Sequence, residues 1–178
     1  PVLEGGVPET PETPEQPETP AAASVVFNEL CGNKIPDGPQ KYIELYNAGE
    51  AEADLSGWTI YKNNVADPIW TAPAGMKLAA GAYLVLEADQ ADPTLGFNAG
   101  LSAKKEVKFE LKDASGNLVD KFVRGNDAVV DGEEAKLEEN TEDSFSRVPN
   151  GTGDFAYAAP TPGAANGEKT GDIEGYNK

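Results

Sequence analysis

Two glutamates and one arginine are the residues of this chain whose types and positions could support chemistry. Glu29 and Glu44 lie in short apolar segments near the start of the chain, and Arg147 lies in a similar segment near its end. Two carboxylates that converge on one bond can act as acid and base, as glycosidases use them. Such pairs arise by chance among 31 acidic residues, so the sequence favours a buried network of arginine and carboxylates that ties the first strands to the last.

The alternation of side chains along a strand suggests how this network is arranged. Ile43 and Leu45 occupy one face of their segment and send Glu44 to the other face, between two tyrosines. Arg147 shares a face with Phe145, so its guanidinium rises beside an apolar anchor and can make a forked contact with a carboxylate. The sequence therefore predicts that Arg147 pairs with Glu44 as first choice and with Glu29 as second.

The composition excludes several kinds of active site. The chain has no histidine, which removes Ser-His-Asp and Cys-His nucleophile systems and histidine-ligated zinc. Its single cysteine, Cys31, cannot form an internal disulfide and is expected to be an apolar packing residue, with a reactive thiol or an intermolecular bridge as the alternative. We expect no enzyme activity, no cofactor and no dedicated metal site.

The net charge of −17 restricts the partners of the chain. Phosphate backbones and anionic membranes bind through clustered lysine and arginine, so no direct contact with nucleic acid is expected. Eight carboxylates gather between Gly125 and Asp143, in a segment expected to be mainly a surface loop, with a helical turn or two as the alternative for residues 133–139. No EF-hand pattern is present there, which predicts weak attraction of divalent cations and no closed calcium site.

Residues 1–23 have the composition of a spacer. From Val7 to Pro20 proline recurs at every third position, mostly with glutamate and threonine between. Proline blocks helix and ladder hydrogen bonds and like charges resist collapse, so the segment predicts a disordered tether. Such spacers follow the lipid-bearing cysteine of bacterial surface lipoproteins or join modules of secreted proteins. We therefore expect an extracytoplasmic chain, on the cell surface or secreted, with a candidate lipid anchor upstream of residue 1.

Beyond Ala23 short apolar or alternating runs are separated by turn residues, which is typical of an all-β sandwich. The expected strands cover residues 25–30, 41–47, 57–61, 69–70, 83–86, 106–112, 118–122 and 145–148. Trp58 is expected in the core, with aromatic stacking on a ligand as the alternative. Trp70 lies between two prolines and is the candidate ligand contact.

Seven phrases in this part of the chain resemble, in order, those of the lamin tail domain. They are VVFNEL at 25–30, YIELYN at 42–47, DLSGWTI at 54–60, GMKLAAGAYLVL at 75–86, FNAGLSAKKEVKFELKDASGNLVD at 97–120, SFSRVPNGTGDF at 144–155 and PTPGAAN at 160–166. The resemblance implies an immunoglobulin-like β-sandwich over residues 24–166, followed by a flexible tail over 167–178. The acidic stretch before Ser144 is longer than this family usually has, and no coiled-coil rod precedes the domain.

The resemblance also implies a function. It points to a non-catalytic binding or structural module of a bacterial surface or secreted protein, with a protein or a glycan as partner. Lamin-tail-like modules in bacteria are also attached to secreted nucleases and phosphatases. The alternative is therefore an accessory domain of a larger secreted hydrolase.

Overall fold

The structure is a computed structural model that describes residues 21–178. Most of the predicted tether lies outside these residues. The described part of the chain forms strands joined by turns and loops and has no helix. It therefore contains no helical segment with the length and hydropathy that crossing a membrane requires.

Thirteen strands follow one another along residues 21–178. They are β1 (Val25–Cys31), β2 (Tyr42–Asn47), β3 (Ala53–Asp54), β4 (Thr59–Lys62), β5 (Trp70–Thr71), β6 (Lys77–Leu78), β7 (Tyr83–Ala88), β8 (Gly96–Phe97), β9 (Val107–Lys112), β10 (Leu118–Arg124), β11 (Ser144–Val148), β12 (Asp154–Ala158) and β13 (Tyr176–Asn177). Each of the eight expected strands overlaps one of these. The short strands β3, β6, β8, β12 and β13 were not predicted.

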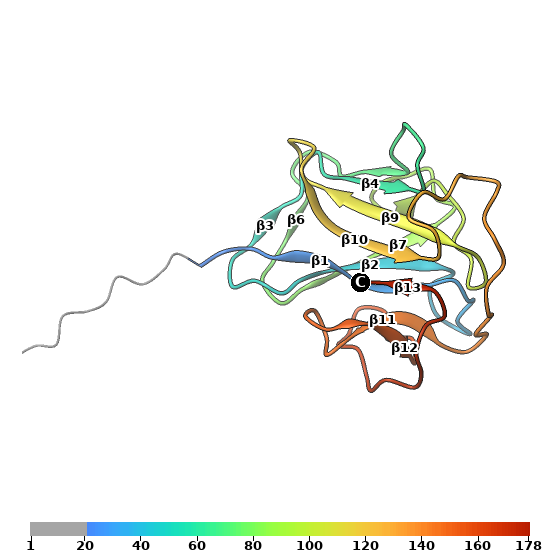
Figure 1. The fold of residues 1–178 in the computed structure, drawn as a ribbon. Coiled ribbons are helices and arrows are strands. Elements are labelled where there is room, and N and C mark those ends of the chain that lie inside the picture. Colours follow the sequence, from blue (N-terminus) through green and yellow to red (C-terminus); the bar gives the residue numbers. More distant parts are fainter. Residues whose placement is uncertain (1–20) are drawn as a thin grey trace, which may run out of the picture.

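The strands form two main sheets that pack face to face (Figure 1). One sheet has six strands in the order β12-β11-β1-β2-β7-β8, and the other has five in the order β13-β10-β9-β4-β5. Strands β3 and β6 form a separate two-stranded ladder, and β7 and β8 pair in parallel. The predicted all-β, immunoglobulin-like sandwich is confirmed.

The core between the sheets is built from alternate residues of the strands. Ile43 and Leu45 of β2 point into it together with Ile60 of β4 and Leu111 of β9, and all four are 0% exposed. Trp58 is half-buried and packs against the same core. The side chains on the opposite faces of these strands are then free for polar contacts.

Aromatic rings join the two sheets near the end of the chain. Phe122 of β10 stacks on Phe145 of β11, with ring centroids 5.3 Å apart, and meets Phe155 of β12 edge-on at 4.9 Å. Tyr176 of β13 also stacks on Phe122, with ring centroids 5.9 Å apart. Such pairs contribute beyond their buried area, so the late strands are tied firmly to β10.

A bulge in β1 decides which of its residues leave the core. The core side chains Phe27 and Leu30 are three positions apart, and strict alternation would turn one of them outward. The register between β1 and β2 shifts between Phe27 and Glu29. The shift brings both apolar residues inward and leaves Asn28 and Glu29 together on the outer face of the six-stranded sheet.

The last twelve residues are packed against the sandwich, so the expected flexible tail at 167–178 is wrong. Gly171 bridges to Tyr157 of β12, Ile173 is 7% exposed, and β13 pairs with the end of β10. Figure 1 shows the C-terminus beside β13, against the body of the domain. The packing of this segment could not be predicted from its polar sequence, because Ile173 and Tyr176 make its apolar contacts with the core.

Candidate functional site

A buried polar cluster lies on the outer face of the six-stranded sheet. Glu29, Glu44 and Asn28 are each 0% exposed, as are Tyr42 of β2 and Ser146 of β11, and Ser144 is 1% exposed. Glu29 and Glu44 are direct partners in the register of β1 and β2. The two predicted glutamates are therefore next to each other, and away from the core.

Residues 160–166, here called the strap, cover this cluster. The backbone N–H of Thr161 donates to Oε1 of Glu29 at 3.0 Å, and the N–H of Gly163 donates to Oε2 of Glu44 at 2.7 Å. Gly163 has a φ of 77°, a left-handed conformation that glycine adopts without strain. The strap thus replaces the water that would otherwise cover these carboxylates.

Asparagines fix the far end of the strap. Nδ2 of Asn166 donates to the carbonyls of Asn28 at 2.9 Å and Arg147 at 3.0 Å. Oδ1 of Asn150 accepts from Nδ2 of Asn28 at 3.1 Å and from the N–H of Asn166 at 2.9 Å. This network connects β1 with the turn after β11 and with the strap.

Burial is the largest influence on the pKa values of the two glutamates. It raises the pKa of Glu44 to about 7, against the hydrogen bonds from Asn28 and Gly163, and the nearby charge of Glu29 raises it further. Burial also raises the pKa of Glu29, while bonds from Ser144 and Thr161 oppose it. Each glutamate therefore holds its proton more tightly than an exposed glutamate does.

This arrangement does not favour acid–base catalysis on a substrate. A glycosidase presents its two carboxyl groups to a sugar in an open cleft. Here both are 0% exposed, and their oxygens accept hydrogen bonds from the protein itself. The geometry supports a structural role, in which the carboxylates hold the strap to the sheet.

The predicted partner of Arg147 is wrong. Its Nη2 donates to both carboxylate oxygens of Asp120 of β10, at 2.9 and 2.8 Å. Its Nε donates to the carbonyl of Phe27 at 2.7 Å, and its guanidinium lies over the ring of Phe155 at 4.5 Å. Ser144 and Ser146 take the face of β11 that meets the glutamates, so alternation sends Arg147 to the opposite face, toward the other sheet.

Arg124 is a buried polar residue that the sequence reasoning missed. It is 0% exposed, and its Nε donates to the carbonyl of Glu174 at 3.0 Å and its Nη1 to that of Ala103 at 2.8 Å. Its guanidinium lies over the ring of Phe145 at 5.1 Å. The available signal was its spacing, since Arg124 follows the core residue Phe122 by two positions in one strand.

The predicted ligand contact Trp70 is buried. Its side chain belongs to the core at 3% exposure, and its Nε1 donates to the carbonyl of Pro93 at 2.9 Å. It only borders a shallow hollow of about 200 Å³ that also contacts Gln90 and Asn98. Pairing of β5 with β4 sets Trp70 opposite the core residue Ile60, which explains why the expected exposure is wrong.

The acidic segment between Gly125 and Asp143 is a loop whose carboxylates meet lysines. Asp127 lies 3.6 Å from Lys108, and Glu134 lies 3.4 Å from Lys105. The backbone at residue 136 bridges to Lys105, and the helical alternative for residues 133–139 is not formed. Among residues 21–178 no group of three or more acidic or sulfur ligands has the geometry to hold a metal ion.

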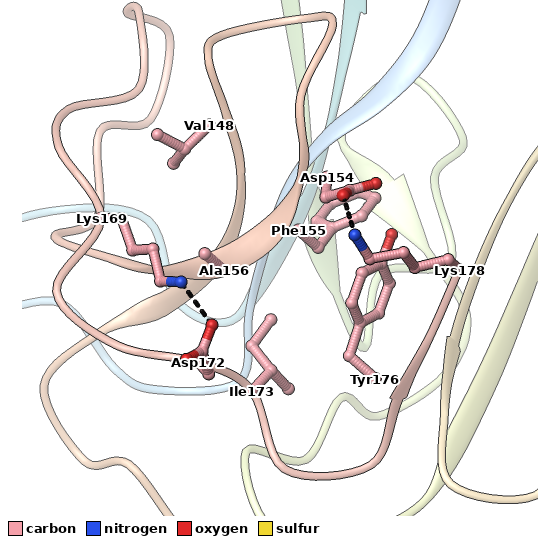
Figure 2. Close-up of a pocket in the computed structure, with 9 residues that line it drawn as sticks. All are labelled: Val148, Asp154, Phe155, Ala156, Lys169, Asp172, Ile173, Tyr176 and Lys178. Carbon is pink, nitrogen blue, oxygen red and sulfur yellow. Dashed lines mark hydrogen bonds and ion pairs between the residues drawn. The ribbon is translucent and has the colours of Figure 1, made fainter.

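A surface hollow of about 390 Å³ lies between β12 and the C-terminal segment (Figure 2). Ile173 and Tyr176 approach Phe155 and Ala156 there and give it an apolar floor. Two ion pairs flank it, one between Lys169 and Asp172 and one between Lys178 and Asp154. This hollow is open to solvent, in contrast to the cluster under the strap.

The fold and its polar contacts define an immunoglobulin-like β-sandwich in which buried polar groups hold strands and closing segments together. The sequence matches the family model of the Lamin Tail Domain over residues 18–126. The chain belongs to this family of non-catalytic domains, and the predicted family is confirmed. The match reaches from β1 to the end of β10, and β11, β12 and β13 complete the two sheets beyond it. No curated protein sequence matches the chain.

Proposed function

We propose that this chain is a non-catalytic module displayed outside the cytoplasm, where it serves as a binding or structural unit of a surface or secreted protein. The observation that carries the proposal is that the strap covers the carboxylates of Glu29 and Glu44 and shields them from solvent. The residues best suited to acid–base chemistry are 0% exposed and hold the strap instead. The proline-rich composition of residues 7–20 supports display on a spacer, anchored through a lipid upstream.

The partner in this proposal is a protein or a glycan. A net charge of −17 opposes binding to phosphate backbones and anionic membranes. The hollow beside β12 supports a binding role because four charged side chains, Asp154, Lys169, Asp172 and Lys178, line it together with Tyr176.

Surface labelling of intact source cells tests the location. An antibody raised against residues 24–178 and a membrane-impermeant biotin reagent are applied to intact and to lysed cells. We expect equal labelling in both, whereas labelling only after lysis would contradict display outside the cytoplasm. An immunoblot band from a much longer chain would favour the accessory-domain alternative.

Hydrolysis assays test the absence of catalysis. The parent chain and the variants Glu29→Gln and Glu44→Gln are incubated with p-nitrophenyl glycosides and phosphate esters. All three are expected to match the rate in buffer alone. Turnover by the parent that either substitution abolishes would establish an enzyme.

A further inference from the structure

Glu29 and Glu44 form a cross-strand pair without a cation. They are opposite each other in the register of β1 and β2, on the face away from the core. Side chains in such positions have Cβ atoms about 4.5 to 5.5 Å apart. Neither carboxylate has a lysine or arginine nitrogen within ion-pair distance among residues 21–178. Two negative charges at these positions would repel each other without compensation.

The strap depends on the same two side chains. The carboxylate of Glu29 accepts hydrogen bonds from the backbone N–H and the hydroxyl of Thr161. The carboxylate of Glu44 accepts a hydrogen bond from the backbone N–H of Gly163. The strap leads directly into the C-terminal segment, which borders β12 and supplies β13. Loosening the strap would therefore free the chain that packs against β12 and β10.

The other titratable groups near the pair do not change charge around neutral pH. Burial raises the pKa values of Tyr42 and Tyr83 above their ordinary value of 10.0 and that of Cys31 to about 11. The charge of Lys41 acts on Cys31, where it opposes the rise in pKa. Glu44, whose pKa burial raises to about 7, is thus the group of the cluster that changes charge near neutral pH.

We propose that Glu29 and Glu44 form a proton-linked latch, which holds the strap on the six-stranded sheet while the pair keeps a proton and loosens as the pair becomes fully ionised. The strap N–H groups bind a singly charged pair without difficulty, because hydrogen-bond donors favour charge on the oxygens they contact. The second charge meets the first one in a buried site, and the least costly relief is to admit water beneath the strap.

The direction of the pH effect follows from the raised pKa. Glu44 titrates near pH 7 in the closed state and near its ordinary value of 4.5 when exposed. The closed state therefore binds more protons than the open state. The stabilisation of the closed state by this proton is complete below pH 4.5 and disappears as pH rises through 7. One such group changes the closing equilibrium roughly tenfold per pH unit within this window.

Amide hydrogen exchange of the parent chain tests the latch directly. Protection factors of the Thr161 and Gly163 amides, corrected for the intrinsic pH dependence of exchange, are measured between pH 5 and 7. We expect them to fall about 40-fold over this range, because the pH dependence flattens near each of the two pKa values. The amide of Leu55, which donates to the carbonyl of Met76 at 2.8 Å in the β3–β6 region, is the internal reference and should stay constant.

Two amide variants supply the control. In Glu29→Gln the new NH₂ group can donate to Oγ of Ser144, which can donate to the carbonyl of Ala158 instead. The fall in protection should shrink to less than tenfold in Glu44→Gln, which removes the group that titrates near pH 7. It should shrink by less in Glu29→Gln, because burial and not the charge of Glu29 is the main cause of the raised pKa of Glu44. Constant protection in the parent, or the parent's full slope in a folded Glu44→Gln variant, would overturn the latch.

Discussion

At the scale of single residues, the contact between Arg147 and Asp120 joins the two sheets. Both side chains are 15% exposed, and the arginine also donates to the carbonyls of Phe27 and Gly153. Removing one partner of a buried pair leaves the other charge desolvated. Arg147→Ala and Asp120→Ala should therefore each lower the free energy of unfolding in urea by about 3 to 5 kcal/mol. Each substitution removes four hydrogen bonds, because Asp120 also accepts from the backbone N–H groups of Phe27 and Lys121.

A double-mutant cycle and an exposed pair serve as controls for this prediction. The double variant Arg147→Ala/Asp120→Ala should be less destabilised than the sum of the single variants by roughly 1 to 3 kcal/mol. Lys77 and Glu52 form an ion pair at 3.2 Å with both side chains more than half exposed, so Lys77→Ala should cost at most about 1 kcal/mol. Full additivity at Arg147 and Asp120 would refute the coupling.

The sequence identified the polar residues of the cluster better than their partners. Alternation placed Ile43 and Leu45 in the core and Glu44 on the opposite face, as the structure shows. The same rule, applied across β11, puts Arg147 on the face opposite to Ser144 and Ser146, but it does not tell which of these two faces lies on the same side of the sheet as Glu44. Partner choice depends on sheet order and on the β1 bulge, which are properties of the whole topology.

At the scale of elements, the C-terminal segment completes the sandwich. Ile173 is 7% exposed, Tyr176 stacks on Phe122, and the carbonyl of Glu174 accepts from the buried Arg124. A chain that ends at residue 166 loses these contacts and leaves Arg124 with an unmet donor. We expect its free energy of unfolding to fall by about 3 to 5 kcal/mol, since burial of one large apolar side chain alone is worth about 1.5 to 3 kcal/mol.

Thermal unfolding of two truncated chains checks this prediction. Removal of residues 167–178 should lower Tm by at least about 6 °C, because 1 kcal/mol shifts the Tm of a chain of this size by roughly 2 to 4 °C. Removal of residues 1–20, for which the sequence predicts no packing, should leave Tm unchanged. Equal melting of the chain ending at 166 and the parent would show that the segment contributes nothing.

Element prediction succeeded where a strand carries its own apolar pattern. The runs at 83–86 and 106–112 became β7 and β9, and the turn chemistry at 113–117 separated β9 from β10. The strands that were missed have two residues each or, like β12, lie in a short segment rich in alanine. Such strands exist because neighbours supply their hydrogen bonds, so their local sequence contains little signal.

At the scale of the whole molecule, negative charge dominates the surface, yet part of it is already compensated. The net charge is −17, and the acidic loop places Asp131 near Lys62 and Asp127 near Lys108 and Lys121. The described carboxylates form no cluster of three or more that could hold a metal ion. Divalent cations should therefore be attracted by the overall field and not by a closed set of ligands.

Calorimetry with Ca²⁺ at two salt concentrations tests this expectation. In about 10 mM salt the Debye length is about 30 Å, so many surface carboxylates act together and weak binding heat should appear. At physiological ionic strength the length falls to about 8 Å, and the heat should nearly vanish because separated charges no longer act in concert. A specific site would behave differently, since ligands at about 2.3 to 2.6 Å from the ion are screened little by salt. Asp127→Asn and Asp131→Asn should each leave the low-salt heat almost unchanged, whereas a stoichiometric micromolar site that either substitution removes would contradict diffuse attraction.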